Sequence, residues 1–182
     1  RVLVKWTLPS PVRFRWAITS ARLGRWLRPV LPAVFRPLLD LAPTSVPGRQ
    51  SWPSLIPALG PRRGRVALLT GCAQQVLAPD ITAAALAVLS QQGIEVVVPT
   101  SQGCCGGLAW HTGDLSTAQR YARRTLDAFP DDVDAILTTA AGCGSAMHEY
   151  ALILRGTPDE ARAERFRLQV KDASGFLVDL GL

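Results

Sequence analysis

The chain has 182 residues, of which 48% are hydrophobic and 19% charged, and this balance excludes a wholly disordered protein. No apolar run reaches the roughly 18 residues that a helix needs to cross a bilayer. The N-terminal stretch also lacks the continuous apolar core of a signal peptide. Four cysteines are too few for a disulfide scaffold. We therefore expect one compact domain with an extension, located in the cytoplasm.

The net charge of +6 is unevenly distributed along the chain. Residues 1–65 carry twelve Lys or Arg and a single acid, Asp40, which gives +11. Residues 66–182 carry eight Lys or Arg against thirteen Asp or Glu, which gives −5. This asymmetry is typical of a basic arm attached to a mildly acidic domain. Because the sequence starts at Arg1 and ends directly after an apolar run, we expect a fragment of a longer polypeptide.

Residues 1–64 hold most of the prolines and four of the five tryptophans, and we expect them to form a basic, Pro/Trp-rich helical connector. The stretch between Pro11 and Pro29 is compatible with a helix, and the pieces that follow are short and bounded by proline. The connector has two candidate contacts, a protein surface (a partner subunit or the rest of the chain) and the inner face of the cell membrane. Nucleic acid is a much weaker candidate, and we expect none.

Residues 65–182 alternate short apolar runs with helical patterns, which predicts a three-layer α/β domain with a parallel sheet. The run RVALLTG reads as a buried strand, and IEVVVP is rich in the β-branched residues that strands favour. The final VKDASGFLVDLGL is apolar enough to pack on the sheet. We expect strands at 65–71, 94–99 and 134–140, and helices at 81–93, 113–129, about 145–154 and about 158–167.

All four cysteines follow the ends of predicted strands. Cys72 closes the first strand, Cys104 and Cys105 lie a few residues beyond the second, and Cys143 lies just beyond the third. The carboxyl ends of parallel strands share one edge of the sheet, where ligand crevices form. The sequence therefore predicts that three loops bring four thiols together at that edge.

Four converging thiolates have few chemical uses. They suit tetrahedral zinc or an iron–sulfur cluster. A structural zinc site usually shows Cys-x-x-Cys knuckles, and this sequence has none. The adjacent Cys104 and Cys105 have Cα atoms only ~3.8 Å apart, which is awkward for one small ion, whereas neighbouring thiolates can reach different irons of a cluster. We therefore favour an iron–sulfur cluster held by Cys72, Cys104, Cys105 and Cys143, with zinc as the alternative.

Other interpretations of these residues stay open. The four cysteines could be buried structural thiols, or Cys104 and Cys105 could form a thiol–disulfide redox pair. His111 could donate a hydrogen bond near the site, although a surface histidine is the more common case. His148, Glu149 and Tyr150 are interpreted as packing or solvent-facing groups rather than as acid–base catalysts. We find no Ser/His/Asp arrangement and predict no catalytic residue.

The cysteine pattern resembles the CCG cysteine-rich domain. Thirty-one residues separate Cys72 from Cys104, Gly106 follows the cysteine pair, and thirty-seven residues separate Cys105 from Cys143. That domain occurs in heterodisulfide reductase B subunits and in the iron–sulfur subunits of glycolate, lactate and anaerobic glycerol-3-phosphate oxidising systems. Three segments around the cysteines are most similar to the glycolate oxidase iron–sulfur subunit, namely LLTGCAQQ, VPTSQGCCGGLAWHTGD and TTAAGCGSAMHEY.

The resemblance implies an electron-transfer subunit of a flavin-linked 2-hydroxyacid oxidase, with the flavin on a partner subunit and electrons passing to a membrane acceptor. It also implies further iron–sulfur segments in the full-length chain. One departure concerns the last motif: the family's fuller pattern ends in Cys-x-x-Cys, and Ala140 occupies its first position here. The remaining four cysteines resemble the ligands of an ordinary four-iron (4Fe-4S) cluster rather than a five-thiolate arrangement. The alternative functions are a thiol–disulfide module of the heterodisulfide reductase type and a structural zinc scaffold.

Overall fold

The protein was analysed as a computed structural model, which describes residues 2–40 and 42–181. Its centre is a five-stranded sheet in the order β1-β3-β2-β4-β5. The last four of these strands run parallel, and β1 pairs antiparallel with β3 at one edge. The strands are β1 (Leu55–Ile56), β2 (Gly64–Leu69), β3 (Ile94–Val97), β4 (Ala135–Thr138) and β5 (Val170–Asp172).

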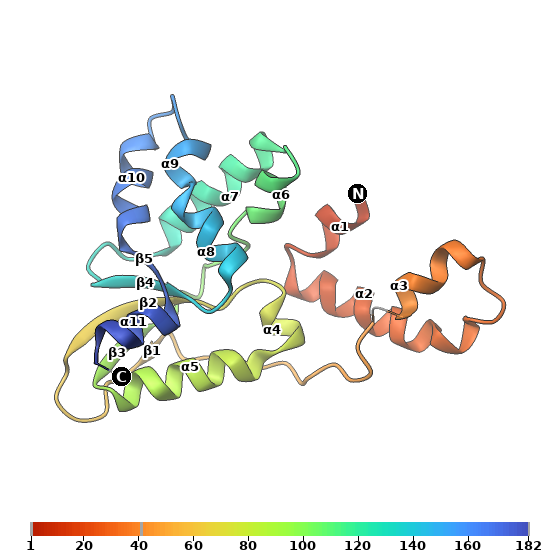
Figure 1. Ribbon diagram of the computed structural model, residues 1–182, viewed down its shortest axis with the longest axis horizontal. Helices are drawn as coiled ribbons and strands as arrows, with labels where there is room; N and C mark the ends of the chain where they lie inside the picture. The colour runs from red at the N-terminus through yellow and green to blue at the C-terminus, as the bar shows by residue number, and fades with distance from the viewer. Residues whose placement is uncertain (1, 41, 182) are drawn as a thin grey trace.

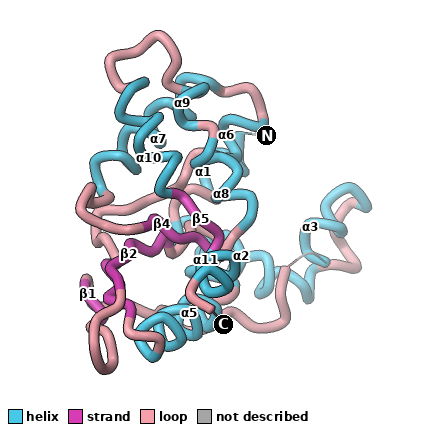
Figure 2. The backbone as a smooth tube through the Cα atoms, turned by 60° about the vertical axis from the view of Figure 1, so that its left-hand side comes forward, coloured by secondary structure: helices cyan, strands magenta, loops and turns pink. Residues whose placement is uncertain are grey.

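Helices cover both faces of this sheet, which confirms the predicted three-layer α/β fold (Figures 1 and 2). Successive residues of a strand point to opposite faces, so the central strand β2 contributes to both cores. One face carries α5 (Pro79–Gln91) and α11 (Ala173–Asp179). The other face carries α6 (Gly107–His111), α7 (Leu115–Ala128), α8 (Ala141–His148), α9 (Tyr150–Ile153) and α10 (Glu160–Gln169). Val66 and Leu68 pack with α5 and α11, whereas Ala67 and Leu69 pack on the other side.

Three strands and the helices between them match the sequence prediction closely, but some boundaries differ. The helix expected from residue 145 begins at Ala141, so Cys143 lies in the first turn of α8. The chain then breaks at Glu149 and continues as the short helix α9. The helix expected at 158–167 spans Glu160–Gln169. The strands β1 and β5 and the short helices α4 (Gln74–Leu77), α6 and α11 were not predicted.

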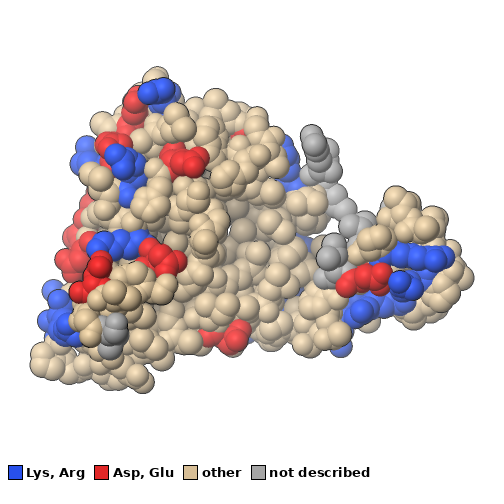
Figure 3. Space-filling view, viewed as in Figure 1, with Lys and Arg blue, Asp and Glu red and all other residues tan. Residues whose placement is uncertain are grey.

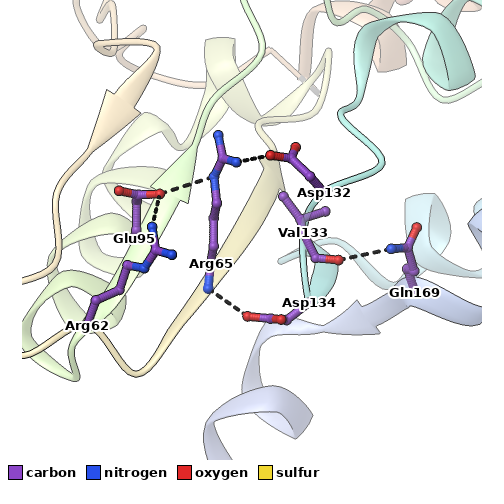
Figure 4. Close-up of polar contacts among 7 residues, drawn as sticks. All are labelled: Arg62, Arg65, Glu95, Asp132, Val133, Asp134 and Gln169. Atoms are coloured by element: carbon purple, nitrogen blue, oxygen red, sulfur yellow. Dashed lines mark hydrogen bonds and ion pairs between the residues drawn. The ribbon is translucent and has the colours of Figure 1, made fainter.

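The amino ends of the central strands form a charged edge (Figure 4). The four cysteines follow the carboxyl ends of these strands, at the opposite edge. Arg65 on β2 forms ion pairs with Glu95 on β3 and with Asp132, which precedes β4. Arg62 pairs with the same Glu95, at 3.2 Å. The backbone N–H of Arg65 also donates to the Asp134 carboxylate at 2.7 Å. These contacts tie the three central strands together at the edge away from the site.

The connector forms a helical arm beside this domain (Figure 1). Its basic side chains gather on the arm in the space-filling view (Figure 3), and Trp16 and Trp26 are 71% and 77% exposed. Within the described parts of the chain, no helix combines the length and apolar character needed to cross a membrane. The arm comprises α1 (Val2–Thr7), α2 (Pro11–Leu23), the 3₁₀ turns η1 (Gly24–Leu27) and η2 (Ala33–Phe35), and α3 (Arg36–Asp40). The division of the chain at residue 64 stays a prediction, although β1 of the connector joins the sheet.

An ion pair of 3.0 Å links the arm to the domain, between Lys5 and Asp114. The Asp114 carboxylate also caps α7 by accepting from the backbone N–H of Thr117. The hydrogen bond from Lys5, and after it the one from Thr117, hold the pKa of Asp114 below its ordinary value of 3.8. A carboxyl with a depressed folded-state pKa contributes stability above its unfolded-state pKa, and this contribution is lost as the pH falls through the folded-state value.

We therefore expect Asp114→Asn to lower the unfolding midpoint near pH 7, and we expect this difference from the wild type to shrink as the pH falls below 3.8 towards the lowered folded-state pKa. Asparagine retains most of the capping ability, so the difference reports mainly on the contact with Lys5. Urea unfolding of both proteins across this pH range checks the prediction. A difference in the unfolding midpoint that does not shrink as the pH is lowered below 3.8 would contradict it.

Candidate metal centre

The four cysteines lie at the carboxyl edge of the sheet, on three loops. Cys72 is the third residue after β2, Cys104 and Cys105 lie between β3 and α6, and Cys143 lies in the first turn of α8 after β4. Cys72, Cys104 and Cys105 are at most 8% exposed, and Cys143 is half-buried. The strand order places β2 between β3 and β4, so the loop with Cys72 lies between the other two.

The thiols form a connected row. The Cys72 thiol donates to the sulfur of Cys104, with the two Sγ atoms 3.8 Å apart. Cys105 lies close enough to Cys104 and to Cys143 for each pair to shift one another's pKa. Among the described residues, no three His, Cys, Asp or Glu side chains are grouped as ligands of one metal ion would be. The structure thus brings together all four cysteines that the sequence singled out, and their role as ligands stays a prediction.

The surroundings lower the pKa of two of the thiols and raise the pKa of the other two. Hydrogen bonds from the Cys105 and Cys72 thiols, together with the Gly106 backbone N–H, lower the pKa of Cys104. A hydrogen bond with Cys105 likewise lowers the pKa of Cys143. The pKa of Cys72 and that of Cys105 are raised, because each donates to Cys104 and because both are buried. Metal ligation requires thiolates, so binding at this site would release protons.

Glycines bring the backbone close to the sulfurs. Gly106 has φ +84° and its N–H points at the Cys104 sulfur, 3.4 Å away. A Cβ on this residue would lie 3.0 Å from the Cβ of Tyr121 on α7, so the turn fits only glycine. A Cβ on Gly107 would lie 3.6 Å from the Cys105 sulfur and 3.1 Å from the Cβ of Ala146. The loop therefore keeps the space beside the sulfurs free of side chains.

Two glutamines, which the sequence analysis did not single out, tie the three loops together. Gln102 accepts from the backbone N–H of Thr70, at the end of β2, at 2.8 Å. Gln74 donates to the hydroxyl of Thr139, which follows β4, also at 2.8 Å. The first contact links the Cys72 loop to the Cys104 loop, and the second links it to the Cys143 loop. Both glutamines stand within two residues of a cysteine, and this proximity was the only signal in the sequence.

Tyr150 also supports the site, although the sequence analysis interpreted it as a packing group. Its hydroxyl donates to the backbone carbonyl of Cys105 at 2.7 Å, and its ring stacks on Phe166 with centroids 5.6 Å apart. Burial raises the pKa of Tyr150 well above its ordinary value, so the hydroxyl remains a donor. His111 and His148 are exposed, and Glu149 accepts from the indole N–H of Trp110.

We expect Tyr150→Phe to lower the free energy of unfolding by about 1–3 kcal/mol, because it leaves the buried carbonyl of Cys105 without a partner. Tyr121→Phe is the matched control, since the Tyr121 hydroxyl has no hydrogen-bond partner in the described part of the chain. Urea unfolding of both variants checks the prediction. Equal and small losses would show that the Tyr150 hydroxyl does not hold the cysteine loop.

The donor set fits an iron–sulfur cluster. It consists of four soft sulfur ligands on three loops, a backbone N–H already directed at one sulfur, and mostly buried surroundings. Soft thiolates select zinc or iron–sulfur clusters, and hydrogen bonds to sulfur tune a cluster's potential. Cys72, Cys104, Cys105 and Cys143 would hold the cluster, which would supply a site for reversible one-electron storage.

The chain is similar to a known domain family and to several known proteins. Residues 66–148 match the Cysteine-rich domain family, CCG. Over 167 residues, the chain is 35% identical to the probable glycolate oxidase iron–sulfur subunit of Bacillus subtilis (strain 168), which covers 89% of this chain and 37% of that protein. It is 35% identical over 177 residues to the glycolate oxidase iron–sulfur subunit of Escherichia coli (strain K12), covering 95% of this chain and 40% of that protein.

A third relative is lactate utilization protein A of Geobacillus kaustophilus, 29% identical over 117 residues, which are 64% of this chain and 48% of that protein. No solved structure matches the chain. The chain spans about two fifths of the length of the two glycolate oxidase subunits.

Proposed function

We propose that the chain, whose residues 66–148 match the CCG cysteine-rich domain family, is an iron–sulfur electron-transfer module of a flavin-linked 2-hydroxyacid oxidase. The observation that carries this proposal is the connected row of four buried or half-buried thiols on three loops. The relatives named as glycolate oxidase iron–sulfur subunits support it. The substrate class follows from the same names, and glycolate is the favoured substrate.

We propose a four-iron (4Fe-4S) cluster with Cys72, Cys104, Cys105 and Cys143 as its ligands. Four thiolates are the usual complement of such a cluster. The protein's part is to hold the sulfurs and to set the potential. The Gly106 N–H would stabilise negative charge on the Cys104 sulfur, and the buried walls would limit solvent access. Tyr150 would fix the backbone of Cys105, so that the distance between neighbouring sulfurs stays constant during electron transfer.

The remaining parts of the proposed complex lie outside this chain. A flavin-containing subunit would oxidise the 2-hydroxyacid, and this module would pass the electrons to an acceptor without a catalytic residue of its own. Other iron–sulfur segments of the longer polypeptide would share the transfer. We propose a cytoplasmic location, at the inner face of the cell membrane. The connector, 1–64, would contact a partner protein or that membrane surface, and 65–182 would form the CCG domain.

The proposal is tested on the complete complex, purified without oxygen together with its flavin subunit. Addition of glycolate should reduce the flavin and then the cluster of this domain. Electron paramagnetic resonance monitors the reduction of the cluster. A Cys104→Ser complex identifies the signal of this cluster, because the other clusters remain. Lactate and glycerol 3-phosphate, added separately, identify the substrate. If glycolate reduces the flavin while the wild-type and variant spectra stay identical, this domain does not carry the electrons.

One observation favours a second candidate, a thiol–disulfide module of the heterodisulfide reductase type. The Sγ atoms of Cys72 and Cys104 are in hydrogen-bond contact, and the pKa of Cys104 is lowered. A thiolate next to a second thiol is the usual arrangement of a redox-active cysteine pair. This candidate predicts a rapidly alkylated thiol and disulfide exchange in protein that contains no iron. A structural zinc scaffold would instead show one zinc per chain and no colour.

A further inference from the structure

Three arginines on one side of α7 lie directly beside the cysteine loop. Arg120, Arg123 and Arg124 are spaced by three and four residues, so their side chains share one face of the helix. With Ser101 of the cysteine loop they line a cavity of about 510 Å³. We call this surface the arginine face. It stands out because residues 66–182 have a net charge of −5 and only eight basic side chains.

Two of the three arginines have no carboxylate partner among the residues that the structure describes. Arg123 forms an ion pair with Asp159 at 2.7 Å. Asp127, which also lines the cavity, is paired with Arg162 at 2.6 Å. Neither Arg120 nor Arg124 forms an ion pair within the described part of the chain, and both are exposed. The arginine face therefore presents two uncompensated guanidinium charges to the solvent.

Arg124 places one of these positive charges next to the loop that carries Cys104 and Cys105. Its guanidinium donates to the backbone carbonyl of Ser101 at 3.5 Å. A Cβ built on Gly103 would lie 3.3 Å from the guanidinium carbon of Arg124, and Gly103 immediately precedes Cys104. A molecule bound to Arg124 would thus contact the loop that holds the cysteine pair. Arg120 lies one helical turn away, over the ring of Tyr121 at 5.6 Å.

We propose that the arginine face is the docking surface for an acidic surface of the protein that exchanges electrons with this domain. The proposal rests on the proposed function for the electron exchange. Arginine pairs with carboxylates through two parallel hydrogen bonds, and two exposed guanidiniums one turn apart fit two carboxylates on a protein surface. Redox encounters are often small and transient, and opposite charges raise their association rate. Docking here would place the partner beside Cys104 and Cys105.

The test uses the full-length chain and a fluorescently labelled hexaglutamate peptide at low ionic strength. We expect the dissociation constant to rise by about tenfold in Arg120→Gln/Arg124→Gln, because the paired charges are removed. The matched control is Arg22→Gln/Arg49→Gln, which removes two exposed arginines from the connector and should change the dissociation constant by less than about twofold. Both variants should unfold at the wild-type temperature, because all four side chains lie at the surface.

Equal losses of peptide affinity in the two variants would overturn the proposal, since the affinity would then depend only on the net charge of the protein. No loss in the arginine-face variant would overturn it too. Displacement of the peptide by millimolar inorganic phosphate would indicate a small-anion site instead of a docking surface. The proposed function and the docking surface can fail separately. If the purified protein contains no iron, but peptide binding is lost in the arginine-face variant alone, the proposed function is refuted and the docking surface is supported.

A second readout tests whether the face lies on the electron path. The ferricyanide trianion takes one electron from the reduced cluster, which returns to its oxidised state, and no proton is transferred. At low ionic strength this reaction should slow several-fold in Arg120→Gln/Arg124→Gln and stay unchanged in Arg22→Gln/Arg49→Gln. With the cationic oxidant hexaammineruthenium(III), the arginine-face variant should not slow. Equal ferricyanide rates in all three proteins would contradict docking beside the cysteines.

Discussion

Replacing Cys104 with serine is expected to remove the cluster from this domain. Cys104 is the centre of the thiol row: its sulfur accepts from the Cys72 thiol and from the Gly106 N–H, and the neighbouring Cys105 also lowers its pKa. Serine has a harder oxygen donor and a shorter side chain, so it would neither bind iron well nor reach the same position. We expect the domain's iron content to fall from about four per chain to below about one, with loss of the charge-transfer absorption.

Cys143→Ser provides the comparison within the same site, because Cys143 is half-buried and lies at the end of the row. It should also reduce the iron content, while a partly assembled cluster could survive. Ser101→Ala, on the same loop but exposed, controls for general effects of mutation and should keep full iron content. Full iron content in Cys104→Ser would exclude Cys104 as a ligand, and with it the proposed ligand set.

Replacing Gly106 with alanine should destabilise the protein and impair iron binding together. A left-handed backbone costs a non-glycine residue about 1–2 kcal/mol. At Gly106 the new Cβ would also lie 3.0 Å from the Cβ of Tyr121, and crowding of this kind adds about 1–3 kcal/mol. We therefore expect a loss of about 2–5 kcal/mol in the free energy of unfolding. The displaced turn would also move the N–H away from the Cys104 sulfur.

Gly113→Ala separates the two causes, because Gly113 has φ +76° and nothing lies within 4 Å of its built Cβ. This variant should lose only the backbone contribution of about 1–2 kcal/mol and keep its iron. Urea unfolding and iron analysis of both variants provide the comparison. If the two variants lose equal stability and both keep their iron, close packing at Gly106 does not shape the site.

Much of the fold could be predicted, because three strands and their helices carry strong local patterns. The run VALL is buried and aliphatic and forms most of β2, and IEVV, with three β-branched residues, forms β3. The two residues of β1 could not be found, since a pair of residues between prolines has no periodicity and its pairing with β3 is non-local. The start of α8 was placed too late because AGCGS contains two glycines, which read as a loop.

The meeting of the four cysteines followed from topology alone, since each stands after a parallel strand. The supporting residues could not be predicted in the same way. Gln74, Gln102 and Tyr150 act through hydrogen bonds to groups 32 to 65 positions away in the sequence. Nothing in a glutamine or a tyrosine indicates such a partner before the chain is folded. The arginine face was likewise visible only once α7 lay beside the cysteine loop.

The central claim is that these four cysteines bind an iron–sulfur cluster. It is tested most directly by iron, sulfide and zinc analysis with an absorption spectrum, on protein purified without oxygen. The claim predicts about four irons and four sulfides per chain and a broad absorption near ~400 nm that bleaches on reduction. One zinc per chain without colour, or metal-free protein with readily oxidised thiols, would contradict it.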